Sequence, residues 1–181
     1  MLFLWRIKRR VIRRAVPLPK HAYKSGDSFY VWGEPLILQV VKGTDAGVQR
    51  AGNLLYIMTA ARSTREARET LLYAWLKEEI AARLPEVFAK AEAKVGRYAS
   101  SYYLRLMKSR WGTCSIRSGR ICINVRLAHL QPYYLDYVVT HELTHLWEPN
   151  HGAGFKMKMD VFYPGWRLVR KQLRDEGKKA F

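Results

Sequence analysis

The sequence contains few cysteines, few acidic residues and no long hydrophobic run. Cys114 and Cys122 are the two cysteines among 181 residues, too few for the disulfide framework of a small secreted domain. No stretch approaches the roughly 20 apolar residues of a membrane-spanning helix. The apolar run at the N-terminus precedes its positive charges, whereas a secretory signal has the reverse order. We therefore expect a cytoplasmic protein without a transmembrane segment.

Positive charge dominates the composition. The chain has 32 Lys and Arg against 15 Asp and Glu, a formal net charge of +17. A field of this sign attracts nucleic acid, anionic lipid or acidic protein. Apolar residues make up 49% and charged residues 26%, close to the globular average, so the chain can bury a core. Its length indicates one compact domain with an appendage.

The appendage is a basic N-terminal arm, residues 1–24, with eight Lys or Arg and no acid. Apolar residues recur in it at helical spacing: Leu4, Ile7, Val11 and Ala15. This spacing allows an amphipathic helix within residues 2–16. The arm could be a solvated segment, bind nucleic acid non-specifically, face an anionic membrane, or fold back on the domain.

Residues 25–181 alternate between strand and helix patterns and are expected to form a single domain. The first strands read as an antiparallel meander. Ser63 and Glu66 resemble a helix capping box, and Pro85 predicts either two consecutive helices or one kinked helix. The expected elements are strands within 29–59, helices over 64–95, a hairpin over 102–127 turning at Ser118-Gly119, a helix over 132–147 and C-terminal helices over 152–176.

The helix expected over 132–147 carries the sequence His141-Glu142-Leu143-Thr144-His145. Residues four apart project from one helix face, so both imidazoles can bind a single zinc ion. Glu142 then lies beside the metal, where its carboxylate can accept a proton from a zinc-activated water. This spacing is typical of zinc peptidases and predicts hydrolysis of peptide bonds.

A catalytic zinc site requires three protein ligands and an open position. His151 follows the segment that breaks the helix and is the expected third ligand. Glu148, in the breaking turn, and Asp160, on the next helix, are the rival candidates.

Several separated motifs resemble, in the same order, the YgjP-like metallopeptidase family, which is related to the SprT-like and WLM zinc proteases. They lie at residues 111–115, 121–127, 136–139, 141–146 and 150–155. The resemblance implies an α+β fold, a minimal zincin with small antiparallel sheets and the HExxH motif on the active-site helix. It also implies one zinc ion held by His141, His145 and His151, with Glu142 as the catalytic base. Thr113 and Lys156 depart from the residues that the family commonly has.

In zincins a strand that precedes the active-site helix pairs with the extended substrate. Residues 120–125 occupy this place, which makes Ile123 and Asn124 candidate substrate-binding residues. The alternative is a core hairpin in which Asn124 has a structural role. Asp136 could bond to a zinc histidine or act at the helix end, and Tyr163 could stabilise the oxyanion or pack in the core.

The leading hypothesis is a cytoplasmic zinc metallopeptidase that acts on protein or peptide substrates. The alternative is a nucleic-acid-associated protein in which zinc is structural, or a protease that is targeted to DNA-bound proteins. An unligated Glu142 favours catalysis, because a structural zinc site closes with a fourth protein ligand.

Overall fold

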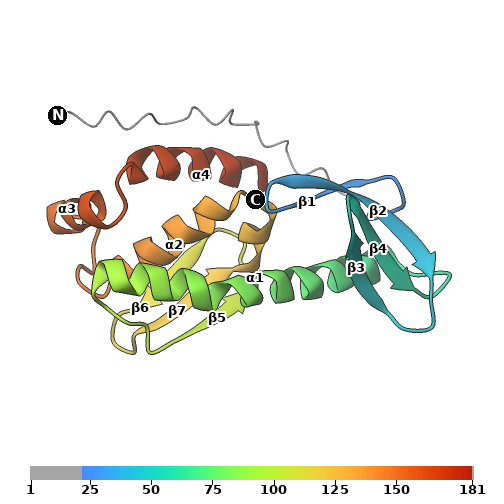
Figure 1. The fold of residues 1–181 in the computed structure, drawn as a ribbon, viewed down its shortest axis with the longest axis horizontal. Coiled ribbons are helices and arrows are strands. Elements are labelled where there is room, and N and C mark those ends of the chain that lie inside the picture. Colours follow the sequence, from blue (N-terminus) through green and yellow to red (C-terminus); the bar gives the residue numbers. More distant parts are fainter. Residues whose placement is uncertain (1–21, 181) are drawn as a thin grey trace, which may run out of the picture.

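Two small β-sheets and four α-helices make up residues 22–180, the part of the chain that the computed structural model describes (Figure 1). The helix expected within residues 2–16 lies outside this part. In chain order the elements are β1 (Ser28–Val31), β2 (Glu34–Lys42), β3 (Gly47–Ala51), β4 (Leu54–Thr59), α1 (Arg65–Val95), β5 (Ser101–Arg105), β6 (Gly112–Ser115), β7 (Arg120–Asn124), the 3-10 helix η1 (Val125–His129), α2 (Pro132–Thr144), α3 (Ala153–Phe162) and α4 (Trp166–Ala180). The α+β class expected from the sequence is confirmed.

The N-terminal sheet has the strand order β1-β2-β4-β3, in which β2 and β4 run parallel. The expected antiparallel meander is therefore wrong. Strands β2 and β4 place buried side chains next to each other, as at Leu38 and Leu55, so they form the centre of the sheet. Strand β3 has no buried residue and takes an edge, where solvent exposure costs little.

Helix α1 is continuous over 31 residues and runs along both sheets (Figure 1). Its N-cap is Thr64, whose hydroxyl accepts a hydrogen bond from the Ala67 amide at 3.2 Å, and not Ser63. The helix continues through Pro85. Its buried stripe is Leu72, Leu76, Ile80, Leu84, Phe88, Ala91 and Val95. The free energy gained by burying this unbroken stripe exceeds the cost of the backbone hydrogen bond that Pro85 removes.

The second sheet has the order β5-β7-β6, with β5 parallel and β6 antiparallel to β7. The turn between β6 and β7 has four residues, 116–119, and not the two that the sequence indicated. Cys114 consequently pairs with Ile121, and Thr113 with Cys122. The cysteines lie on opposite faces of the sheet, and both are free thiols. Like the first sheet, this one is mixed, so the expectation of antiparallel sheets is wrong in both cases.

Helix α2 begins at Pro132, as expected, because proline fits the first helical position. It ends at Thr144, earlier than the expected residue 147. Its apolar residues Leu135, Val138, Val139 and Leu143 are buried in the core. The helix lies between α1 and α4 and beside β6 and β7. Within residues 22–180, no helix is both long and apolar enough to cross a bilayer.

Candidate metal centre

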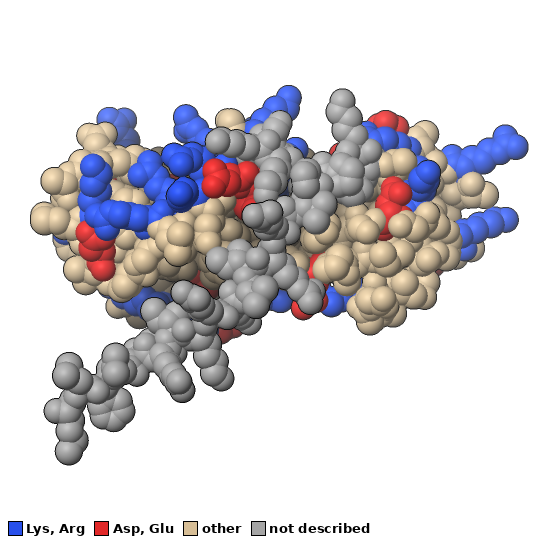
Figure 2. All heavy atoms as spheres, turned by 90° about the horizontal axis from the view of Figure 1, so that it is seen from above, with Lys and Arg blue, Asp and Glu red and all other residues tan. Residues whose placement is uncertain are grey.

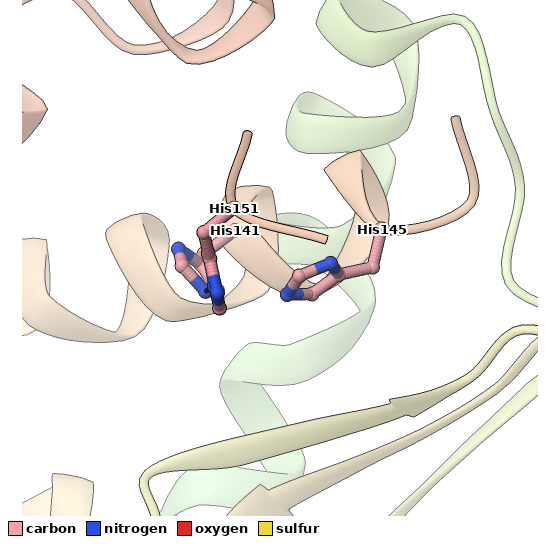
Figure 3. A group of neighbouring side chains, drawn as sticks. All are labelled: His141, His145 and His151. Atoms are coloured by element: carbon pink, nitrogen blue, oxygen red, sulfur yellow. Dashed lines mark hydrogen bonds between the residues drawn. The ribbon is translucent and has the colours of Figure 1, made fainter. Parts of the chain in front are cut away.

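Three histidines converge at the end of α2 (Figure 3). His141 and His145 project from the same face of the helix, one turn apart, and His151 lies in the segment between α2 and α3. One nitrogen from each ring lies within 4.8 Å of those from the other two. Nε2 of His141 and Nε2 of His151 are 2.9 Å apart. The cluster predicted from the sequence spacing therefore forms.

The protein fixes the orientation of two of these rings through their Nδ1 atoms. Nδ1 of His145 contacts the backbone carbonyl of Glu148 at 3.0 Å. Nδ1 of His141 lies 3.4 Å from the hydroxyl of Tyr137, one helical turn earlier. A metal-binding histidine usually forms such a bond through its second nitrogen. Sequence reasoning missed Tyr137, although its position four residues before His141 was the available signal.

Phe155 packs against all three imidazoles. Its ring centroid lies 4.9 Å from that of His141 and 4.7 Å from those of His145 and His151. The side chain is 1% exposed. Helix α3 therefore supplies an apolar wall that restricts the ring positions.

The surroundings of His141 and His151 favour the neutral imidazole that binds metals. Burial, reinforced by the neighbouring His145 and His151 rings, lowers the pKa of His141 to about 3. Burial and His145 also lower the pKa of His151. A neutral imidazole has a free lone pair, which is what a metal ion requires. The donor set thus fits a divalent metal such as zinc, which accepts nitrogen ligands.

The rival third ligands are not part of the cluster. The carboxylate of Glu148 lies against Gly154, where an added Cβ would stand 2.8 Å from its Oε1 atom. Asp160 accepts a hydrogen bond from the Trp166 indole at 2.8 Å and pairs with Arg167. Of the three candidates, only His151 meets the two helix histidines.

Glu142 lies beside the cluster in a tightly packed position. Its side chain is buried, at 7% exposure, and faces the first residue of β6. An added Cβ at Gly112 would stand 2.7 Å from Oε1 of Glu142 and 2.9 Å from Cγ1 of Val138. Burial raises the pKa of Glu142 to about 8, and the Arg110 guanidinium opposes this rise. A glycine at position 112 therefore makes room for the carboxylate.

The candidate substrate-binding residues Ile123 and Asn124 do not reach the surface, since both are 0% exposed. Strand β7 has partners on both sides, so the prediction that it pairs with substrate is wrong. The Asn124 side chain donates to the carbonyls of Met107 (3.1 Å) and Arg110 (2.6 Å). Asn124 therefore holds the segment that leads into β6.

Asp136 and Tyr163 do not contact the three histidines. Asp136 lines a cavity of about 400 Å³ together with Lys90 and Lys94 of α1. Tyr163 donates to the carbonyl of Tyr133 at 3.2 Å. Its ring packs edge-to-face on Tyr137, with centroids 5.7 Å apart. Of the two roles considered for Tyr163, packing in the core therefore agrees with its position.

The family model of the YgjP-like metallopeptidase domain matches residues 6–176. Among solved structures, the zymogen of abylysin from Pyrococcus abyssi aligns at 18% identity and a TM-score of 0.48, covering 54% of this chain and 97% of that one. The zymogen of jannalysin from Methanocaldococcus jannaschii aligns at 15% identity and a TM-score of 0.45, covering 51% and 94%. No curated protein gave a sequence match. Because the family match extends over nearly the whole sequence, the chain belongs to the YgjP-like metallopeptidase family.

Proposed function

We propose that this metallopeptidase hydrolyses peptide bonds with one zinc ion, held by His141, His145 and His151, and with Glu142 as general base. The observation that carries the proposal is the convergence of three imidazoles, with ligand nitrogens within 4.8 Å of one another, beside a buried carboxylate. Three protein ligands leave a zinc site with an open position, which is the arrangement of catalytic rather than structural zinc.

The metal would contribute Lewis-acid chemistry: a zinc ion in such a site polarises a carbonyl and lowers the pKa of water. The nitrogen donors and the two contacts that orient their rings, from Tyr137 and Glu148, support this choice.

Glu142 would hold and move the proton. Its carboxyl group is buried, and burial raises its pKa to about 8. A carboxylate whose pKa is raised toward neutrality is a stronger base than an exposed one, and its acid form can then protonate the leaving amine. Gly112 leaves the carboxylate the room that a side chain at this position of β6 would take.

Strand β6 is the better candidate for binding the substrate backbone. It lies at the end of its sheet, with β7 on one side, and it packs beside α2. An extended peptide can add to such an edge through main-chain hydrogen bonds. Substrate bound in this way would lie next to Glu142, whose carboxylate faces Gly112 of the same strand.

The substrate is a protein or peptide, and we place the reaction in the cytoplasm, where the two free thiols would persist.

The test is hydrolysis of an unstructured protein such as casein by the full chain after metal removal. We expect no cleavage in the metal-free protein and recovery on addition of one equivalent of zinc. Activity that survives complete removal of metal would contradict the proposal.

A further inference from the structure

Two arginines lie close to the predicted catalytic groups on different elements. Arg110 stands in the segment before β6, and its charge lowers the pKa of Glu142 against the effect of burial. Gly112, two residues later, touches the Glu142 carboxylate. Because Asn124 binds the Arg110 carbonyl at 2.6 Å, the backbone of Arg110 is fixed beside Glu142.

Arg170 approaches the histidine cluster from α4. This helix packs on α2, anchored by Trp166 and Leu173, which are 2% and 4% exposed. Arg170 follows Trp166 by one helical turn, and its guanidinium lies over the Trp166 ring at 5.9 Å from the centroid. Tyr163, three residues before α4 begins, packs on Tyr137, whose hydroxyl contacts Nδ1 of His141. The first turns of α4, which carry Arg170, therefore start beside the histidine cluster, and the charge of Arg170 also contributes to lowering the pKa of His141 and His151.

Both guanidinium groups have unused hydrogen-bond donors. Each residue is exposed, and neither has a carboxylate partner among residues 22–180. Arg167, on the same helix as Arg170, is by contrast paired with Asp160. Planar guanidinium groups bind carboxylates through two parallel hydrogen bonds. The free arginines are therefore available to a carboxylate of the substrate.

The part of the chain around Arg110 and Arg170 also carries an excess of positive charge. Residues 101–176 contain 12 Lys and Arg against 6 Asp and Glu. Of these acids, Glu142 is buried and Asp160 is paired. Figure 2 shows Lys and Arg side chains gathered at the α3–α4 end of the molecule. This field attracts acidic substrates and repels basic ones.

We propose that the peptidase selects acidic substrates, with Arg110 and Arg170 binding Asp or Glu side chains close to the scissile bond. The inference rests on the proposed function, because it assigns a substrate class to the same site. Each arginine is a specificity residue that contacts a side chain of the peptide and takes no part in proton transfer.

The test measures binding and cleavage separately. Three fluorescent peptides differ only in the residues that flank the central bond, which are Glu, Gln or Lys. Binding is measured on the full chain with zinc added and with Glu142→Gln, so that no peptide is consumed. We expect the Glu peptide to bind about 10- to 100-fold more tightly than the Gln peptide, and the Lys peptide most weakly.

In the same background, Arg110→Ala or Arg170→Ala should reduce the preference for the Glu peptide about tenfold. Two control variants remove the same charge elsewhere: Lys171→Ala on α4 and Arg117→Ala in the β6–β7 turn. They should leave the preference intact. Arg170→Glu should shift the preference toward the Lys peptide.

Equal affinity for the three peptides would overturn the inference, as would equal losses in Arg170→Ala and Lys171→Ala. Binding of a DNA duplex that depends on both arginines, without a peptide preference, would also overturn it. Cleavage of the same peptides by the wild-type chain separates the two proposals. If the Glu peptide binds best but no peptide is cleaved, only the proposed function is refuted. If all three peptides are bound and cleaved equally, only the inference is refuted.

Discussion

At the residue scale, the histidine cluster depends on contacts that the three rings make with the rest of the protein. Tyr137 and the Glu148 carbonyl orient two of the rings, and Phe155 packs against all three. His151 differs from the other two because it lies in a connecting segment and is exposed. Of the three proposed ligands, His151 is therefore the one that a substitution tests most sharply.

His151→Ala should reduce zinc affinity by more than about 100-fold, because loss of a ligand costs more than loss of a supporting contact. Glu148→Ala is the matched control: it removes the rival carboxylate but keeps the backbone carbonyl that contacts His145. Zinc affinity can be measured by competition with a chromogenic chelator. Strong binding in His151→Ala, together with weak binding in Glu148→Ala, would transfer the role to Glu148.

Glu142 makes the stability of the metal-free protein depend on pH. Its pKa in the folded state, about 8, lies above the ordinary value of 4.5. The folded state therefore binds more protons than the unfolded state between these values, and the free energy of unfolding falls as pH rises through this window.

Glu142→Gln should remove this dependence and stabilise the metal-free protein at pH 9 by a few kcal/mol, with little difference below pH 4. Urea unfolding in the presence of chelator measures the effect. An equal difference between the two proteins at both pH values would contradict the buried position of the carboxyl group.

At the element scale, local patterns were predicted better than pairings between distant segments. The start of α2 at Pro132 follows from the sequence alone, and so does the i, i+4 arrangement of His141 and His145, because both depend on local geometry. The order of strands was not predictable in this way. Whether β2 pairs with β3 or β4 depends on which strands can share a buried face.

The choice of residues 120–125 as the strand that pairs with substrate was wrong for the same reason, because it depended on the order of strands in the sheet. Residues 121–123 form an uninterrupted apolar run, and such a run is typical of a central strand, as β7 proves to be. Strand β6 carries the contact with Glu142 through a glycine, which has no side chain to reveal its role in a hydrophobicity pattern. Tyr137 was missed because its hydroxyl acts on His141, four residues later, within an otherwise apolar helix face.

Gly112→Ala tests the packing of β6 against α2. The added methyl group would overlap the Glu142 carboxylate and Val138, so we expect hydrolysis to fall strongly, with a loss of stability of about 1–3 kcal/mol. Zinc binding should persist, because the three atoms nearest to the added methyl group belong to Glu142 and Val138 and not to a histidine. Gly152→Ala is the control, since a Cβ there meets nothing within 4 Å. Equal activity in the two variants would refute the role of Gly112.

At the scale of the whole molecule, the excess of positive charge predicts electrostatic binding to polyanions. Residues 1–24 contribute eight Lys or Arg and no acid to a net charge of +17. The logarithm of affinity for duplex DNA should fall linearly with the logarithm of salt concentration, with a slope of about −0.9 for each phosphate contact.

Deletion of residues 1–24 should flatten this slope. The measurement compares the full and shortened chains on DNA, RNA and anionic vesicles at several salt concentrations. Binding to vesicles alone would favour a membrane partner for the arm. If the full chain shows no salt-sensitive binding to DNA, to RNA or to vesicles, a polyanion partner is contradicted. The positive charge would then act only on solubility.

Glu142→Gln tests whether one zinc ion and Glu142 together hydrolyse peptide bonds, when zinc content and peptide cleavage are measured on the same sample. The amide preserves the size of the side chain but cannot accept the proton. We predict one zinc per chain, as in the wild type, and a loss of cleavage of about 10²- to 10⁴-fold. Full zinc content with cleavage close to that of the wild type would contradict the role of Glu142 as general base.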